Sequence, residues 1–228
     1  MTSLVEFATM LAPYATVVVY AAPLPTSFQI RREKTVGSLP LLPYSSMAAS
    51  AFIWTVYGFL KQEPKLWGCC LVGVALGSYY FVNFITYSPK AAATLPGSVS
   101  QHLQGVMFTI LATLYVMKWY PAPDELIGLG GVLLSIALFA SPLSSLKHVI
   151  QTKSAKSIPL PFTIASILNC YLWSVAGLYQ MHDANLYVPN LLGLSFALTQ
   201  LLLKLHYGDG GKEHIDDNST PRELELPK

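Results

Sequence analysis

Three side chains within apolar stretches of this sequence could bind a neutral polar solute. Trp54 and Trp173 lie 119 positions apart, and the face of an indole ring can stack on the C–H face of a sugar, although plain core packing uses the same residue type. Asn190 carries a donor and an acceptor that hydrocarbon would penalise, so its side chain must face the protein interior. There it could bind a solute or bond to another helix.

Four prolines, Pro23, Pro43, Pro142 and Pro159, lie at the ends of apolar stretches on one predicted side of a membrane. Each removes a backbone donor and crowds the preceding turn, so each is a place where a helix can bend. Membrane helices also tolerate proline without any special role. Two prolines per half of the chain favour a hinge or gate. Pro40, rather than Pro43, lies 119 positions before Pro159, which leaves open which of the two is the hinge.

The middle of each apolar stretch has no Asp, Glu, Lys, Arg or His. Proton-coupled carriers usually keep ionisable groups there, so the sequence favours uncoupled transport of a neutral solute. The thiols of Cys69, Cys70 and Cys170 have no metal-type spacing with His. No pairing of a nucleophile with a base is visible either, so we expect neither an enzyme nor a cofactor.

The composition places these residues in a bilayer. Of 228 residues, 11% are charged and 53% hydrophobic, and the mean hydropathy is +0.46. About 20 apolar residues span the hydrocarbon core as a helix. Seven stretches qualify: 4–24, 38–60, 66–88, 99–120, 125–147, 158–180 and 185–206. They are continuous rather than alternating, which excludes a β-barrel pattern.

The chain repeats itself at a separation of 119 residues, which brings Ala22-Pro23-Leu24 onto Ser141-Pro142-Leu143 and Trp54 onto Trp173. The repeat predicts an all-α membrane protein with seven transmembrane helices in a 3+1+3 arrangement. Because one helix separates the two units, both enter the membrane in the same orientation, and a pathway is expected between them. The expected units are residues 1–90 and 122–207, with a linker and linker helix at 91–121 and a disordered cytosolic tail at 208–228.

Local signals refine this plan. The first helix is expected to end around Pro23 and Pro25, followed by a short polar segment that contains Arg31. A basic loop is expected around Lys147, Lys153 and Lys156. Three glycines in the third stretch would permit close backbone contact with neighbouring helices. They are Gly68, Gly73 and Gly77.

The cations set the expected orientation. Nine Lys and Arg residues fall on one side of the predicted membrane and three on the other, so the positive-inside rule puts the N-terminus outside and the C-terminus in the cytosol. The plasma membrane is the expected location, with an internal membrane as the alternative. The net charge of +2 is too small to indicate a nucleic-acid partner. Homo-oligomer formation is left open.

The residues resemble the SWEET family of sugar facilitators from about Phe7 to Tyr207. The resemblance rests on short motifs in both repeats: Ala22-Pro23, Lys34-Thr35, Pro43-Tyr44, Tyr57-Gly58, Tyr87-Ser-Pro89-Lys90, Ala140-Ser-Pro-Leu143, Thr152-Lys-Ser154, Pro159, Trp173 and Pro189-Asn190. It implies that the four prolines form an inner gate, that Tyr57 and Asp183 lie toward an outer gate, and that Trp173 and Asn190 line the substrate pocket. The family commonly has an asparagine on the third helix that matches Asn190. Alignment from the Pro89-Lys90 end places Cys70 there, so Cys70 is expected in the pocket, which would have one polar arm.

The resemblance and the residues together predict a passive, bidirectional uniporter for small sugars. Hexoses are favoured because Trp54 and Trp173 would narrow the site. An amino-acid exporter of the PQ-loop type is the alternative, disfavoured because the chain has no Pro-Gln pair. A seven-helix receptor is disfavoured by the repeat.

Overall fold

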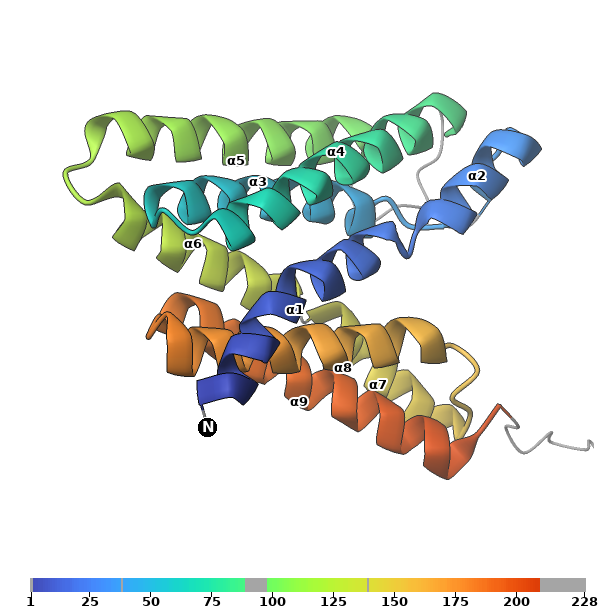
Figure 1. Cartoon of the computed structure of the whole chain (residues 1–228). Helices are drawn as coiled ribbons and strands as arrows, with labels where there is room; N and C mark the ends of the chain where they lie inside the picture. Colours follow the sequence, from blue (N-terminus) through green and yellow to red (C-terminus); the bar gives the residue numbers. More distant parts are fainter. Residues whose placement is uncertain (1, 38, 89–97, 139, 210–228) are drawn as a thin grey trace, which may run out of the picture.

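The computed structural model describes residues 2–37, 39–88, 98–138 and 140–209, and every regular element in them is helical (Figure 1). The elements are α1 Thr2–Ala21, α2 Leu24–Glu33, α3 Leu42–Leu60, α4 Pro64–Tyr87, α5 Val99–Trp119, α6 Pro123–Leu138, α7 Ala140–Thr152, α8 Leu160–Val175, the π-helix η1 Ala176–Gln180 and α9 Ala184–Tyr207. This confirms the predicted all-α fold. Lys90, the linker residues 91–97 and the tail from residue 210 lie outside the described residues.

The helices form two bundles that pack in the same way. In the first bundle α1 and α3 both contact α4, and in the second α6 and α8 both contact α9. One helix of each bundle also packs against the other bundle: α1 packs on α8, and α6 packs on α3 (Figure 1). The linker helix α5 contacts α3 and α6. The contact pattern therefore follows the parallel repeat.

Four helical stretches among the described residues are long and apolar enough to cross a membrane: Ser3–Glu33, Pro64–Tyr87, Leu160–Gln180 and Ala184–Tyr207. Helix α3 has 19 residues and includes several serines, and α6 has 16 residues before the chain passes into α7. The count of seven spans remains a prediction. Large apolar side chains such as Phe108 and Leu205 are more than two-thirds exposed, as expected of a surface that faces lipid.

The segment after Pro23 is a helix, so the predicted polar connection is wrong. Pro25 occupies the first turn of α2, where a missing N–H costs no intrahelical bond. Helix α2 is fixed to α4 because Asn83 Nδ2 donates to Ser27 Oγ over 2.8 Å and to the Ser27 carbonyl over 2.9 Å. Lys147 likewise lies in α7 rather than in a loop.

The two bundles also end alike. Lys34, the C-cap of α2, and Lys153, which follows α7, both have left-handed backbone angles. Lys34 Nζ donates to Tyr87 Oη over 3.2 Å, and Lys153 Nζ donates to Tyr207 Oη over 3.1 Å. We call this the basic end of the molecule, and the opposite end, where α3 meets α4 and η1 meets α9, the short-loop end.

Two of the three predicted glycine contacts are present. A Cβ on Gly77 would lie 2.9 Å from backbone atoms of Ala48 on α3, and a Cβ on Gly73 would overlap the ring of Tyr20 on α1. Gly68 has nothing within 4 Å, so the prediction is wrong there. Gly77 therefore sets how closely α3 and α4 approach.

Candidate functional site

A cavity of about 260 Å³ lies between the two bundles. Its lining comes from α1, α3 and α4 on one side and α6, α8 and α9 on the other. Pockets for drug-sized ligands are typically ~300–1,000 Å³, so this cavity suits a smaller solute. It is the expected position of a pathway between repeats.

The lining is itself repeated. Fourteen of the sixteen described lining residues form seven pairs of matching positions. At a separation of 119 these are Thr16 and Ser135, Val19 and Leu138, Ser50 and Asn169, and Trp54 and Trp173; at 120 they are Leu66 and Leu186, Cys69 and Pro189, and Cys70 and Asn190. The cavity thus lies on the approximate two-fold axis that relates the bundles, and Cys70 faces it at the position matching Asn190.

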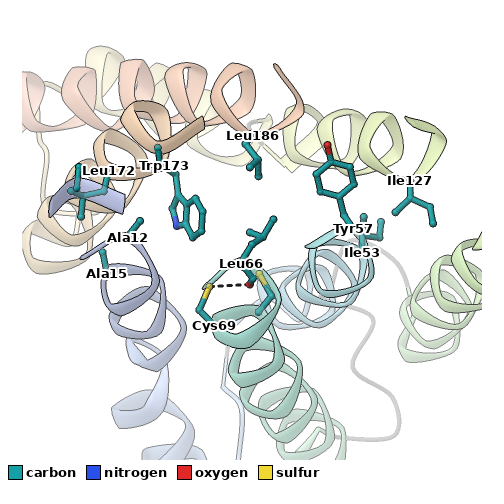
Figure 2. Close-up of a cluster of buried hydrophobic side chains, with 13 residues drawn as sticks. Ala12, Ala15, Ile53, Tyr57, Leu66, Cys69, Ile127, Leu172, Trp173 and Leu186 are labelled. Atoms are coloured by element: carbon teal, nitrogen blue, oxygen red, sulfur yellow. Dashed lines mark hydrogen bonds between the residues drawn. The ribbon is translucent and has the colours of Figure 1, made fainter. Parts of the chain in front are cut away.

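Both predicted tryptophans line the cavity, but they are held differently. Trp173 is 4% exposed and its Nε1–H donates to Thr16 Oγ1 over 2.6 Å. Figure 2 shows its ring between Ala12 on α1 and Leu66 on α4. Trp54 is half-buried, with its ring edge-on to Tyr57 at 5.5 Å between centroids and close against Gly131 of α6. Each ring is therefore fixed by its neighbours before any solute binds.

Thr16 and Asn169 are lining residues that were not predicted. Thr16 Oγ1 donates to Asn169 Oδ1 over 2.7 Å and also lies 3.1 Å from the Ala12 carbonyl oxygen. Thr16 therefore joins α1 to α8 through both Trp173 and Asn169. The signal that could have found it was a polar residue at the same repeat position in both halves, Thr16 and Ser135.

Asn190 and Cys70 present one strong and one weak polar group. Asn190 Nδ2 donates to the Leu186 carbonyl of its own helix over 2.8 Å, and no described residue bonds to its Oδ1. The sequence allowed Asn190 either to bind a solute or to form a hydrogen bond to another helix. Among the described residues Asn190 makes no side-chain hydrogen bond to another helix. Cys70 is 3% exposed, and the neighbouring Cys69 Sγ donates to the Leu66 carbonyl over 3.2 Å (Figure 2).

Tyr57 and Asp183 meet at the short-loop end of the cavity. Tyr57 Oη donates to Asp183 Oδ2 over 2.6 Å, and Asn185 Nδ2 donates to Tyr57 Oη over 3.2 Å. Asp183 Oδ1 also caps α9 by accepting from the Asn185 N–H. Gly128 of α6 makes room for the group, since a Cβ there would lie 2.6 Å from both Tyr57 and Asn185. We call Tyr57, Asp183 and Asn185 the latch.

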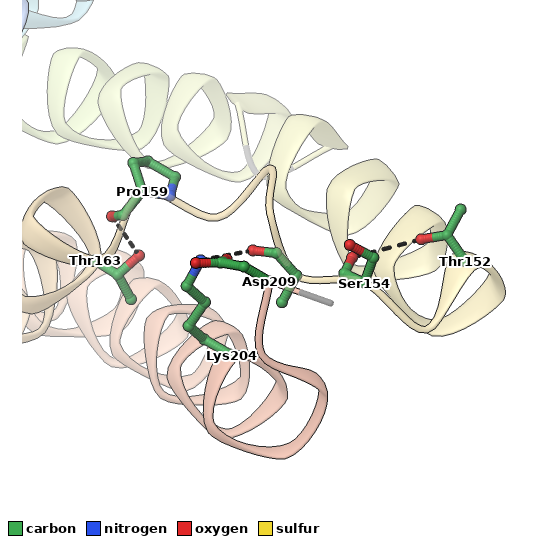
Figure 3. Close-up of polar contacts among 7 residues, drawn as sticks. Thr152, Ser154, Pro159, Thr163, Lys204 and Asp209 are labelled. Carbon is green, nitrogen blue, oxygen red and sulfur yellow. Dashed lines mark hydrogen bonds and ion pairs between the residues drawn. The ribbon is translucent and has the colours of Figure 1, made fainter. Parts of the chain in front are cut away.

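The four predicted gate prolines occupy helix starts. Pro23 separates α1 from α2, Pro43 lies in the first turn of α3, and Pro159 is the N-cap of α8, where its carbonyl accepts from Thr163 (Figure 3). Pro142 falls in the first turn of α7, and its side chain is outside the described part. A proline at a helix start removes no intrahelical bond. The gate role stays a prediction, and breaks between helices, rather than kinks within them, would carry it.

Among the described residues, those lining the cavity include no Asp, Glu, Lys, Arg or His. Its polar groups are hydroxyls, amides, indoles and thiols, all neutral hydrogen-bonding groups. The arrangement can hold a small polar solute against aromatic rings and bond it from several helices.

Cys70→Asn would give both matching positions an amide. We expect this variant to bind solute more tightly, because an amide is a stronger donor and acceptor than a thiol. Asn190→Ala should weaken apparent affinity roughly three- to tenfold, the effect of losing about 0.5–1.5 kcal/mol. Competition binding to the purified protein measures both. A folded Cys70→Asn variant with unchanged affinity would contradict the placement of Cys70 at the bound solute.

Comparison with known proteins agrees with this fold. A family model described as "Sugar efflux transporter for intercellular exchange" matches residues 6–92 and 125–210. A solved structure of a eukaryotic SWEET transporter is 22% identical in sequence and superposes with a TM-score of 0.78, covering 91% of this chain and 100% of that one. The gap between the two matched segments contains α5.

Relatives in plants and animals are similar over most of the chain. Bidirectional sugar transporter SWEET9 of Arabidopsis thaliana is 31% identical over 206 residues, covering 86% of this chain and 77% of the relative. Sugar transporter SWEET1 of Rattus norvegicus is 28% identical, covering 78% and 80%. Bidirectional sugar transporter SWEET13 of Oryza sativa subsp. japonica is 28% identical and covers 82% of this chain. The match spans only 64% of the length of that rice protein.

Proposed function

Since this chain belongs to the SWEET family of membrane transporters, as its family match and its relatives show, we propose that it is a passive, bidirectional uniporter for a small neutral sugar. The protein is an integral membrane protein, and the sugar would cross it by alternating access. The observation that carries the proposal is the cavity on the two-fold axis, lined by Trp54 and Trp173 and by neutral polar groups.

The lining also supports uniport rather than coupled transport. A carrier driven by protons needs a group that gains and loses a proton in the pathway. The described lining residues supply hydroxyls, amides and thiols instead. Sugar should therefore run down its own gradient in either direction.

Uptake of labelled glucose, fructose, galactose and sucrose by yeast that lacks its own sugar transporters tests this proposal. We expect uptake of a hexose that stops at the external concentration and persists when a protonophore is added. Cells with the empty vector are the control, and a labelled neutral amino acid tests the PQ-loop alternative. Accumulation above the external concentration that the protonophore abolishes would contradict a uniporter.

We also propose a hexose rather than a larger sugar as the substrate. The cavity of about 260 Å³ is lined by two indole rings that are held by their neighbours: Trp173 bonds to Thr16, and Trp54 packs close to Gly131. A disaccharide would have to displace one of them. Uptake of sucrose at a rate equal to that of glucose would count against this size limit.

The proposed location is the plasma membrane, with the short-loop end and the N-terminus outside. Arg31, Lys34, Lys153 and Lys204 lie at the basic end, which the positive-inside rule assigns to the cytosol. A tag at the C-terminus should then resist protease added to intact cells. Cleavage of the tag by that protease would overturn the orientation.

For alternating access we propose that residues 1–90 and 122–207 move as two units. The connection at 91–121 and the tail at 208–228 would not line the path. In support, two helices make the main contacts between the units: α1 packs on α8 and η1, and α6 packs on α3. Rocking about these contacts would expose the cavity first at one end and then at the other.

A further inference from the structure

Two cations and two tyrosines form a cluster at the basic end of the first bundle. Arg31 Nη1 donates to Tyr79 Oη over 3.4 Å, and Lys34 Nζ donates to Tyr87 Oη over 3.2 Å. Lys34 Nζ also lies over the Tyr87 ring, 4.9 Å from its centroid. Both cations are exposed and belong to α2 and its C-cap, whereas both tyrosines belong to α4. We call these four residues the α2–α4 cluster.

The tyrosine rings hold their hydroxyls in place. Tyr79 and Tyr87 both pack against the buried apolar side chains that include Ile30 of α2 and Phe84 of α4. A side chain whose ring is already packed loses little freedom when its hydroxyl binds a ligand. The α2–α4 cluster is therefore partly organised before anything binds to it.

The cluster has spare hydrogen-bond donors and positive charge that no carboxylate neutralises. An ammonium group has three N–H donors and a guanidinium has five, and a phenol can donate while its oxygen accepts. Within the described ranges, neither Arg31 nor Lys34 forms an ion pair. Glu33, which lies between them in sequence, accepts from Gln29 over 3.0 Å instead. An anion rich in oxygen would satisfy the spare donors and both charges.

Exposed apolar side chains lie beside the cluster. Phe28 is one turn before Arg31 on α2 and 57% exposed, and Val82 is one turn after Tyr79 on α4 and 61% exposed. Residues three apart share a helix face. Two of the helical stretches that can cross a membrane end at this cluster. Cations beside apolar groups at that level match a phospholipid, whose headgroup lies at the interface with its chains below.

The second bundle has only half of this arrangement. The counterparts of the lysine and its tyrosine, at separations of 119 and 120, are Lys153 and Tyr207, and they form the same contact. The counterparts of the arginine and its tyrosine are Ile150 and Thr199, which provide neither the charge nor the phenol. The repeat thus supplies a matched control within the same molecule.

We propose that the α2–α4 cluster binds the headgroup phosphate of an anionic phospholipid, with Arg31 and Lys34 supplying charge and the two tyrosine hydroxyls donating hydrogen bonds. An anionic lipid fits better than a zwitterionic one, because the ammonium group of a zwitterionic headgroup offsets the charge of its own phosphate. The proposed orientation puts the cluster in the cytosolic leaflet, where anionic lipids give a negative surface. The binding itself depends neither on that orientation nor on sugar transport.

Lipid binding to the purified full-length protein in dodecyl maltoside micelles tests the proposal. Added phosphatidylserine should raise the thermal midpoint by roughly 5–10 °C at about 100 times its dissociation constant, because it binds the folded state. Phosphatidylcholine should bind roughly tenfold more weakly or worse. Arg31→Gln with Lys34→Gln should abolish this preference. Lys153→Gln with Lys156→Gln removes the same charge from exposed positions of the second bundle and should keep the preference.

Three results would overturn the proposal. They are no preference for phosphatidylserine in the parent protein, an equal loss of preference in the second-bundle variant, and equal stabilisation by inorganic phosphate at the same concentration. The last result would mean a site for a free anion rather than for a lipid.

A second variant separates a built site from plain attraction between charges. Tyr79→Phe with Tyr87→Phe keeps both packed rings and both cations and removes only the hydroxyls. It should weaken phosphatidylserine binding roughly tenfold or more, as expected for losing hydrogen bonds to a charged group. Unchanged binding would refute the cluster as the site. If the glutamine variant of the cluster does not fold, the phenylalanine variant decides the proposal alone.

Discussion

Sugar uptake by the Trp173→Ala variant is expected to fall to the level of cells without the protein. The substitution deletes a buried ring that forms one wall of the cavity and removes the N–H that holds Thr16. Truncating a buried Trp typically costs about 3–5 kcal/mol of stability, so the amount of folded protein must be measured beside uptake. Trp173→Phe keeps an aromatic wall without the N–H and should retain part of the uptake.

Trp119→Ala is the matched control, because Trp119 is 67% exposed at the end of α5 and is not among the lining residues. It should leave hexose uptake unchanged. Undiminished uptake by a well-expressed Trp173→Ala variant would remove the cavity from the proposed pathway.

Gly77→Ala should destabilise the first bundle by roughly 1–3 kcal/mol, the usual cost of overpacking. The added Cβ would lie 2.9 Å from the backbone nitrogen and Cα of Ala48. Backbone atoms cannot rotate away as a side-chain end can, so α3 and α4 would have to separate. Thermal unfolding of the purified variant measures this loss.

Gly68→Ala is its control on the same helix, since nothing lies within 4 Å of the position. Alanine is a better helix former than glycine by about 1 kcal/mol, so this variant should be slightly more stable than the parent. Equal stability of the two variants would mean that the close approach at Gly77 is not rigid.

The repeat made most of the fold predictable from sequence. A separation of 119 put Trp54 and Trp173 at the same position of the repeat, and alignment from Pro89-Lys90 matched Cys70 to Asn190. The structure places all four on one cavity. Those positions follow from helical geometry and symmetry, which a sequence records directly. The roles of these residues stay predictions.

Other features depend on contacts that residue type does not reveal. Thr16 could satisfy its hydroxyl on its own helix, as threonines in membrane helices commonly do, so nothing in its type indicated the bonds to Trp173 and Asn169. The helix after Pro23 was missed because proline and arginine suggested a connection, whereas burial of Ser27 and Ile30 against neighbouring helices stabilises it. The π-helix η1 had a signal, since a π-turn absorbs one extra residue and the repeat separation rises from 119 at the tryptophans to 120 at Tyr87 and Tyr207.

The hydrogen bond between Trp173 and Thr16 also bears on when α1 reaches its final contacts during synthesis. The two residues are 157 positions apart, so α1 enters the membrane long before the helix that completes its polar contacts exists. At about 5–20 residues per second, a ribosome needs roughly 10–30 s to cover that interval. During this time Thr16 lacks its two partners on α8, and α1 can settle against α4. The first helix to be made is therefore among the last to reach its final contacts.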